Sequence, residues 1–388
     1  MSVVPVQGKD ASDTREQVVA LLKLLATRLQ WSVARPIIAS TGIHVSRGWS
    51  ETITAASRDA YSDAIWTAAY KRLSKLFRLH TYVGNKRVSF FDLREQNDDS
   101  RARILMWAKK AAVGNLAAVV DKRHFKIVEA PTTKEGLEPY KAPPPKLIAA
   151  HYVGEKLYLQ FFSTRSYTFR EPLDISLMTA SQRKAFSEYE ELIGVRTRSI
   201  PCFDTAVVDT ATELVEIRVD FQPGVTEDKD VSPFSQVIGE LNRIGTKYIN
   251  QSVVGAGLIN LHSAINPMYQ DEKCGRVTAL GFVATGKNSS SNNRGQLHRS
   301  KTKDLRKDEF HVGGKIHVEK IDPYAIGITW QQNDPKGDLS MEIRGSARAL
   351  YNRKLGQVVD VEILGCLDLD DYEFVRDQVL SRLKRPRK

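Results

Sequence analysis

Cysteine is scarce in this sequence. Only Cys202, Cys274 and Cys366 occur among the 388 residues, far apart in the chain and without a CxxC pair. A secreted disulfide scaffold needs an even and closely spaced set of cysteines, so this class of protein is excluded. Three isolated thiols favour a reducing compartment.

Long apolar runs are also absent. The longest apolar-leaning segment, Ala111–Val120, is interrupted by Gly114 and Asn115 and is too short to span a bilayer. Residues 1–13 lack the apolar stretch of a signal peptide. We therefore expect a cytoplasmic protein without a transmembrane segment.

Catalytic motifs are missing as well. Neither GxSxG nor HExxH occurs, and His311 and His317 have no third metal ligand at a suitable spacing. The segment Gly281–Asn288 nearly matches the phosphate-binding pattern GxxxxGK[ST], but Asn288 lacks the hydroxyl group that would bind Mg²⁺. The sequence therefore predicts a protein without catalytic activity or cofactor.

Basic residues are present in excess and are unevenly distributed. The chain has 57 Lys and Arg against 46 Asp and Glu, a net charge of +11. Residues 71–126 hold 14 basic against 5 acidic residues, residues 286–307 hold 7 against 1, and residues 376–388 hold 6 against 1. Segregated positive charge attracts polyanions, so these three stretches indicate a protein that binds nucleic acid.

The predicted interface consists of the lysines and arginines in these stretches, which would neutralise phosphates of DNA or RNA with weak sequence preference. Its members are Lys71, Arg72, Lys75, Arg78, Lys86, Arg87, Arg294, Arg299, Lys301, Lys303, Arg306, Lys307, Arg382, Lys384, Arg385, Arg387 and Lys388.

The N-terminal third is predicted to be mainly helical. Apolar residues recur at helical spacing over residues 13–29, 50–79 and 101–120. A hairpin is expected at Tyr82–Phe91, and a long helix followed by a basic hairpin would be typical of a winged-helix unit. The segment Ile37–Ile43 has the small residues and glycine of a helix-turn-helix turn, although the pattern decays beyond it.

We expect an α+β fold in three units. Residues 1–128 form a helical basic domain, and a proline-rich linker at 129–145 separates it from a mixed antiparallel α+β domain at 146–272. Residues 273–388 form a β-rich domain with a flexible basic loop at 286–307 and a basic terminal helix. Strands are predicted at 146–152, 156–162, 166–170, 198–208, 213–221, 276–284, 310–320, 325–331, 339–344 and 357–364, and helices at 180–193, 233–250 and 370–383.

The preferred function is nucleic-acid binding by a non-catalytic subunit of a nucleoprotein assembly, for instance in replication, transposition or anti-phage defence. One alternative is a metal-dependent nuclease that uses Asp204, Asp209 and Glu216 to hold Mg²⁺, because carboxylates in this order loosely resemble nuclease sites. In this reading Asp204 and Asp209 lie an odd number of positions apart on one strand and should face opposite sides. A second alternative is a scaffolding subunit that binds an acidic protein or anionic lipid.

Overall fold

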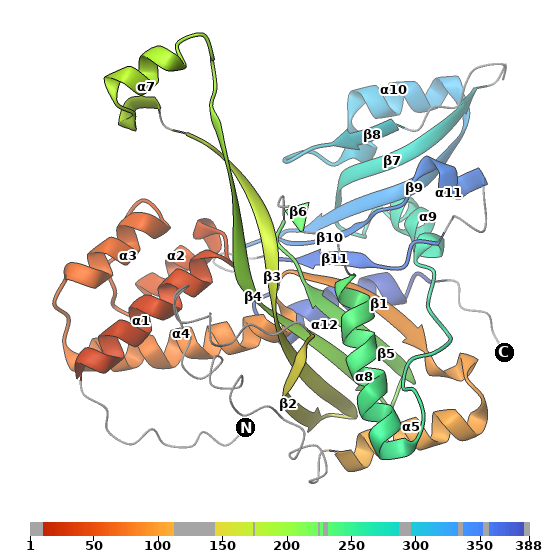
Figure 1. The fold of residues 1–388 in the computed structure, drawn as a ribbon. Helices are drawn as coiled ribbons and strands as arrows, with labels where there is room; N and C mark the ends of the chain where they lie inside the picture. Colours follow the sequence, from red (N-terminus) through yellow and green to blue (C-terminus); the bar gives the residue numbers. More distant parts are fainter. Residues whose placement is uncertain are drawn as a thin grey trace.

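The structure, a computed structural model, describes residues 11–111, 144–173, 175–223, 226–227, 232–286, 296–332, 337–351 and 357–383. The α+β fold is confirmed: helices at the N-terminus are followed by a large antiparallel sheet and a terminal helix (Figure 1). The linker predicted at 129–145 lies outside the described residues apart from Pro144 and Pro145. No helix in these ranges is long and apolar enough to cross a membrane.

The N-terminal helices pack around one apolar cluster. Leu21, Leu22 and Leu25 are fully buried on the first helix, which packs against the fourth. The single helix predicted over residues 50–79 is two helices, because residues 59–62 leave the helical conformation before a new helix begins after Ser62. The helices are α1 (Ala11–Ala26), α2 (Trp31–Ala39), α3 (Trp49–Arg58), α4 (Asp63–Val83) and α5 (Asp98–Ala111).

Among the described residues, eleven strands form one antiparallel sheet. Ten follow the order β2-β3-β4-β5-β1-β11-β10-β9-β7-β8, and β6 pairs with β3. The strands are β1 (Lys86–Asp92), β2 (Lys146–Val153), β3 (Lys156–Pro172), β4 (Ile193–Asp209), β5 (Leu214–Asp220), β6 (Thr226–Glu227), β7 (Arg276–Gly286), β8 (Gln296–Arg299), β9 (Val318–Trp330), β10 (Leu339–Ile343) and β11 (Val361–Leu364).

The central position of β1 corrects the N-terminal prediction. Tyr82 and Val83 belong to the end of α4, and the chain turns at Gly84 and enters the sheet between β5 and β11. The predicted hairpin at Tyr82–Phe91 is therefore wrong, and the β-hairpin that a winged-helix unit requires after its helix is not formed by these residues. One sheet runs through segments that we assigned to three domains.

Helices cover both faces of the sheet (Figure 1). On one face, α8 packs over β5 and α5 packs over β2 and β3, and both helices share an apolar cluster with Val215, Ile217 and Val219. On the other face lie α4 and the terminal helix, and alternate residues of β5 point toward them. The remaining helices are α7 (Ala180–Ala185), α8 (Pro233–Ile249), α9 (His262–Gln270), α10 (Glu309–His317), α11 (Ala347–Tyr351) and α12 (Leu369–Leu380).

Strands β3 and β4 extend beyond the sheet as a two-stranded arm (Figure 1). They pair from Lys156 and Asp209 in the sheet to Pro172 and Ile193 near the tip, whereas β5 pairs with β4 only as far as Thr205. Helix α7 lies at the tip of the arm. The two strands predicted at 156–162 and 166–170 are thus one long strand, and the helix predicted at 180–193 is shorter.

The segment 310–320, predicted as a strand, is mostly helix α10. The Asp308 carboxylate accepts a hydrogen bond from the Phe310 backbone N–H at 3.1 Å and caps the first turn of this helix. Within the basic loop predicted at 286–307, Gln296–Arg299 form strand β8, which pairs with β7. Residues 287–295 of that loop lie outside the described ranges.

Candidate nucleic-acid interface

Helix α4 presents the clearest cationic surface, which we call the α4 face. Lys71, Arg72, Lys75 and Arg78 are exposed, and none forms an ion pair with another described residue. Three of them are spaced four and three residues apart, which places them on one side of the helix. The opposite side is anchored in the core by residues such as Leu73, which is fully buried. These four cations are available to an anionic ligand.

A second exposed group follows β8. Lys301, Lys303 and Lys307 are exposed and have no ion-pair partner within the described part of the chain. Helix α4 and strand β8 lie toward opposite ends of the molecule (Figure 1). The two groups therefore form separate surfaces and do not merge into one.

Four predicted interface residues are already neutralised by carboxylates. A phosphate would have to displace the carboxylate to bind any of them, so they are weaker candidates. Arg87 pairs with Asp360 at 2.7 Å, Arg299 with Glu342 at 2.6 Å, Arg306 with Asp304 at 2.7 Å and Arg382 with Asp271 at 2.5 Å. The other predicted members, Arg294, Lys384, Arg385, Arg387 and Lys388, lie outside the described residues.

Lys86 is not a surface residue. Its side chain is fully buried, its ammonium group pairs with Asp220 at 2.5 Å, and it donates a hydrogen bond to the Thr81 carbonyl oxygen at 2.7 Å. Arg28, which follows α1, pairs with the same carboxylate at 2.7 Å and donates a hydrogen bond to His80 Nδ1 at 3.3 Å. Because Lys86 has no access to solvent, we remove it from the interface.

The burial of these groups shifts their pKa values. Burial acts to raise the pKa of Asp220, but the adjacent charges of Arg28 and Lys86 lower it to about 2. Burial and the charge of Arg28 lower the pKa of His80 to about 3. At neutral pH, His80 is therefore uncharged beside an ionised Asp220.

The same cluster stabilises the point where β4 leaves β5. The Phe203 N–H donates to the Asp220 carboxylate at 2.8 Å, and the Asp220 N–H donates to the Asp204 carboxylate at 2.9 Å. Arg165, at the base of the arm, pairs with Asp204. The two carboxylates thus replace the sheet hydrogen bonds that end where the strands diverge.

A second buried cluster lies farther along β5. Glu216 accepts hydrogen bonds from Arg218 at 2.7 Å and from the Tyr372 hydroxyl at 3.1 Å, and it pairs with Arg376 of α12. Arg376 also pairs with Asp209 at 3.3 Å. Burial acts to raise the pKa of Glu216, but the two guanidinium groups lower it to about 2. We refer to both clusters together as the buried ion network.

This network occupies all three carboxylates of the nuclease alternative. The strand register places Asp204 opposite Phe161 and Asp209 opposite Leu214, so the two carboxylates point to opposite faces of β4. Arginines engage Asp204, Asp209 and Glu216, and none of the three is exposed. Among the described residues, no group of three His, Cys, Asp or Glu side chains could hold a metal ion. The geometry gives the nuclease alternative no support.

Two exposed arginines lie outside the three basic stretches from which the interface was predicted. Arg35 and Arg47 line an open hollow of about 530 Å³ between α2 and α3, and both are exposed without an ion pair to another described residue. The nine residues between these helices are too many for a helix-turn-helix turn, so the partial resemblance of Ile37–Ile43 to such a turn does not correspond to a motif in the structure. Residues 11–83 hold ten Lys and Arg against five Asp and Glu, which was the signal available in the sequence.

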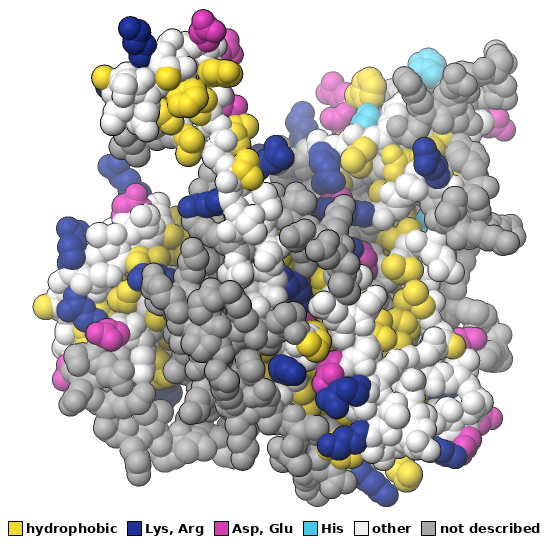
Figure 2. Space-filling view, viewed as in Figure 1, with side chains coloured by type: hydrophobic (Ala, Val, Ile, Leu, Met, Phe, Trp, Pro, Cys, Tyr) yellow, Lys and Arg dark blue, Asp and Glu magenta, His cyan; other side chains and the backbone are white. Residues whose placement is uncertain are grey.

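The face of the molecule seen in Figure 2 carries basic side chains over the N-terminal helices, on the arm and near the lower edge. They are distributed over several elements instead of forming one continuous patch. Any interface therefore depends on particular groups of unpaired cations, of which the α4 face is the most compact.

Comparison with known proteins adds no identification, because no family model, curated protein or solved structure matches this chain.

Proposed function

We propose that this chain binds nucleic acid through the phosphate backbone, without chemistry of its own, as a subunit of a nucleoprotein assembly. The observation that carries the proposal is the α4 face, where four exposed cations have no carboxylate partner in the described structure. Most other predicted cations with described positions are paired or buried, so these four would lose no ion pair on binding a phosphate.

The size of the effect follows from counterion release. If each of the four cations neutralises one phosphate of a duplex, the affinity falls with salt with a logarithmic slope of about −3.6. Between about 50 and 200 mM salt this slope weakens binding by about 150-fold. The slope is smaller for a single strand, at about −2.8 for the same four contacts.

The test is a variant in which Lys71, Arg72, Lys75 and Arg78 are all replaced by Gln. Fluorescence anisotropy with a short labelled duplex and with single-stranded DNA and RNA gives the affinity at increasing salt. We expect the variant to lose most of the salt dependence, because the charges that release counterions are gone. A separate variant in which Lys301, Lys303 and Lys307 become Gln measures whether the second group contacts the same ligand.

A matched control removes four positive charges that are already paired. Arg103, Lys109, Arg243 and Arg344 are exposed and pair with Asp99, Glu155, Glu240 and Glu362. Replacing these four by Gln changes the net charge of the chain equally. A slope that drops equally in both variants would show a general charge effect and would remove the α4 face from the proposal.

The arm favours a second candidate function, contact with a protein through apolar side chains, which differs from the acidic protein or anionic lipid of the scaffolding alternative. Near its tip, the side chains of Tyr189, Val195 and Ile193 are 62%, 60% and 53% exposed, which is unusual for large apolar residues. These residues favour a protein contact. Sedimentation velocity over a range of concentrations tests self-association through the arm, which serine substitutions at Tyr189 and Val195 should reduce. A chain that stays monomeric throughout would leave the arm without this role.

A further inference from the structure

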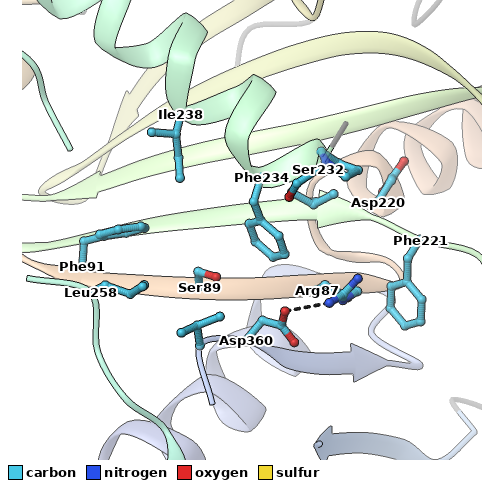
Figure 3. Close-up of a pocket in the computed structure, with 13 residues that line it drawn as sticks. Arg87, Ser89, Phe91, Asp220, Phe221, Ser232, Phe234, Ile238, Leu258 and Asp360 are labelled. Atoms are coloured by element: carbon cyan, nitrogen blue, oxygen red, sulfur yellow. Dashed lines mark hydrogen bonds and ion pairs between the residues drawn. The ribbon is translucent and has the colours of Figure 1, made fainter. Parts of the chain in front are cut away.

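A cavity of about 230 Å³ lies on the face of β1 opposite to the buried ion network (Figure 3). Arg87, Ser89 and Phe91 alternate along β1 with the residues that face the network, so their side chains point into this cavity. The first turn of α8 closes it on one side, and Leu258 and Asp360 close it on the other. The cavity is separate from the α4 face.

Two polar groups in the cavity lack a partner. Ser89 is only 4% exposed, and its hydroxyl forms no hydrogen bond with any described residue. Arg87 donates through Nη2 to the Asp360 carboxylate at 2.7 Å, but its buried Nε has no acceptor among the described residues. An acceptor supplied by a ligand at the Ser89 hydroxyl would therefore be favourable, whereas the Arg87 Nε has almost no surface exposed to the cavity.

Helix α8 adds a third donor region. Ser232 is its N-cap residue but makes no side-chain capping bond, and Pro233 follows at the first helical position. The backbone N–H groups of the first turn therefore have no side-chain cap, and the helix dipole favours negative charge at this end. The two donors favour a hydrogen-bond acceptor, and the helix dipole favours an acceptor with negative charge. Asp360 lines the same cavity and keeps its ion pair with Arg87 Nη2, so the ligand would bind beside this pair without displacing it.

The remaining walls are apolar. Phe91, Phe234, Ile238 and Leu258 line the cavity, and the Arg87 guanidinium lies 5.7 Å from the centre of the Phe234 ring. The volume is below the roughly 300–1,000 Å³ that is typical for drug-sized ligands. We propose that this cavity binds a small organic carboxylate, with its carboxylate group at Ser89 and Arg87 and its apolar body against Phe91 and Leu258.

The experiment uses the full chain and three probes, acetate, benzoate and phenylacetate, each beside the corresponding neutral amide. Ligand-observed NMR and calorimetry give the affinities. We expect benzoate or phenylacetate to bind at least about tenfold more tightly than its amide, since hydrogen bonds to a charged acceptor are the stronger ones. Acetate should bind more weakly than either, because it lacks the apolar body.

Two variants test the location. Ser89→Ala should weaken the preferred carboxylate about fivefold to tenfold, and Leu258→Trp should abolish binding by filling the cavity. Ser340→Ala, the same substitution on β10, is the matched control and should leave the affinity unchanged. Circular dichroism verifies the fold of each variant.

Three results would overturn the proposal: no carboxylate binds, the carboxylates bind no better than the amides, or Ser89→Ala leaves the affinity unchanged. Because none of these variants alters the α4 face, their outcome is independent of nucleic-acid binding.

Discussion

Replacing Asp220 by Asn should destabilise the fold more than almost any other isosteric change in this chain. The Asp220 carboxylate lies against two buried cations, Lys86 at 2.5 Å and Arg28 at 2.7 Å, and accepts the Phe203 N–H at 2.8 Å. Asparagine keeps the shape but removes the negative charge and turns an NH₂ group toward a cation or an N–H donor. Two buried positive charges would then lack their shared counterion.

The expected loss of folding stability follows from values that are typical of buried ion pairs in proteins. Removing one partner of a buried ion pair costs about 3–5 kcal/mol, because the remaining charge stays desolvated. The side chains of Lys86 and Arg28 are 0% and 6% exposed, so water cannot replace the carboxylate without opening the structure. This loss is a large fraction of the roughly 5–15 kcal/mol that stabilises a typical domain.

Urea unfolding at neutral pH, followed by tryptophan fluorescence, measures this loss. Asp99→Asn is the control, because Asp99 pairs with Arg103 on the surface of α5 and should contribute below about 0.5 kcal/mol. Adding Lys86→Met to Asp220→Asn should recover part of the loss, since the double variant no longer buries the lysine charge. A loss below about 1 kcal/mol for Asp220→Asn, or strict additivity in the double variant, would refute the reasoning.

Two further outcomes are expected. Burial and the charge of Arg28 lower the pKa of His80 from 6.5 to about 3, so below pH 6.5 the unfolded chain binds a proton that the folded chain does not. The free energy of unfolding should therefore fall by about 2 kcal/mol between pH 6.5 and 5. His80→Gln should remove this part of the pH dependence in urea titrations. Gly257→Ala should lower the free energy of unfolding by at least about 1–3 kcal/mol, because Gly257 has φ +85° and an added Cβ would lie 2.2 Å from the Asp92 carbonyl oxygen. The control is Gly239→Ala on α8, where a Cβ meets nothing within 4 Å and the change should be neutral or stabilising. Equal shifts in melting temperature for both variants would contradict this reasoning.

The element types were largely predictable where the apolar pattern reflects burial. Strand β2, predicted at 146–152, is observed at Lys146–Val153, and α8, predicted at 233–250, is observed at Pro233–Ile249. Helix α8 has Pro233 at its start and a continuous buried stripe, which are local signals. Such elements need no knowledge of their distant neighbours.

Helix α10 shows where this reasoning fails. Phe310, Val312, Ile316 and Val318 are separated by even numbers of residues, a spacing typical of a strand, yet Phe310 is 71% and Ile316 67% exposed. The even spacing of these apolar residues therefore does not reflect the burial of one face of a strand. Asp308 was the better local signal, because its carboxylate accepts the Phe310 backbone N–H and caps the helix.

The buried ion network could not be predicted from the sequence for a different reason. Glu216, Arg218 and Asp220 alternate with three apolar residues on β5, which is typical of a strand with one solvated face. That face is instead covered by α4 and α12, whose partner residues lie up to 160 positions away in the sequence. Charged residues were therefore interpreted as exposed, and Lys86 was assigned to an interface that it does not reach.

The buried ion network also connects the helices that carry the proposed interface to the sheet. Arg28 links the end of α1 to β5, Lys86 links the end of α4 to it, and Arg376 links α12 to Glu216. Because each buried charge requires its partners, the network favours one placement of the N-terminal helices on the sheet. The α4 face is thereby held on a rigid support, so a folded network variant should keep the salt slope of nucleic-acid binding, and only cations on the surface should change it.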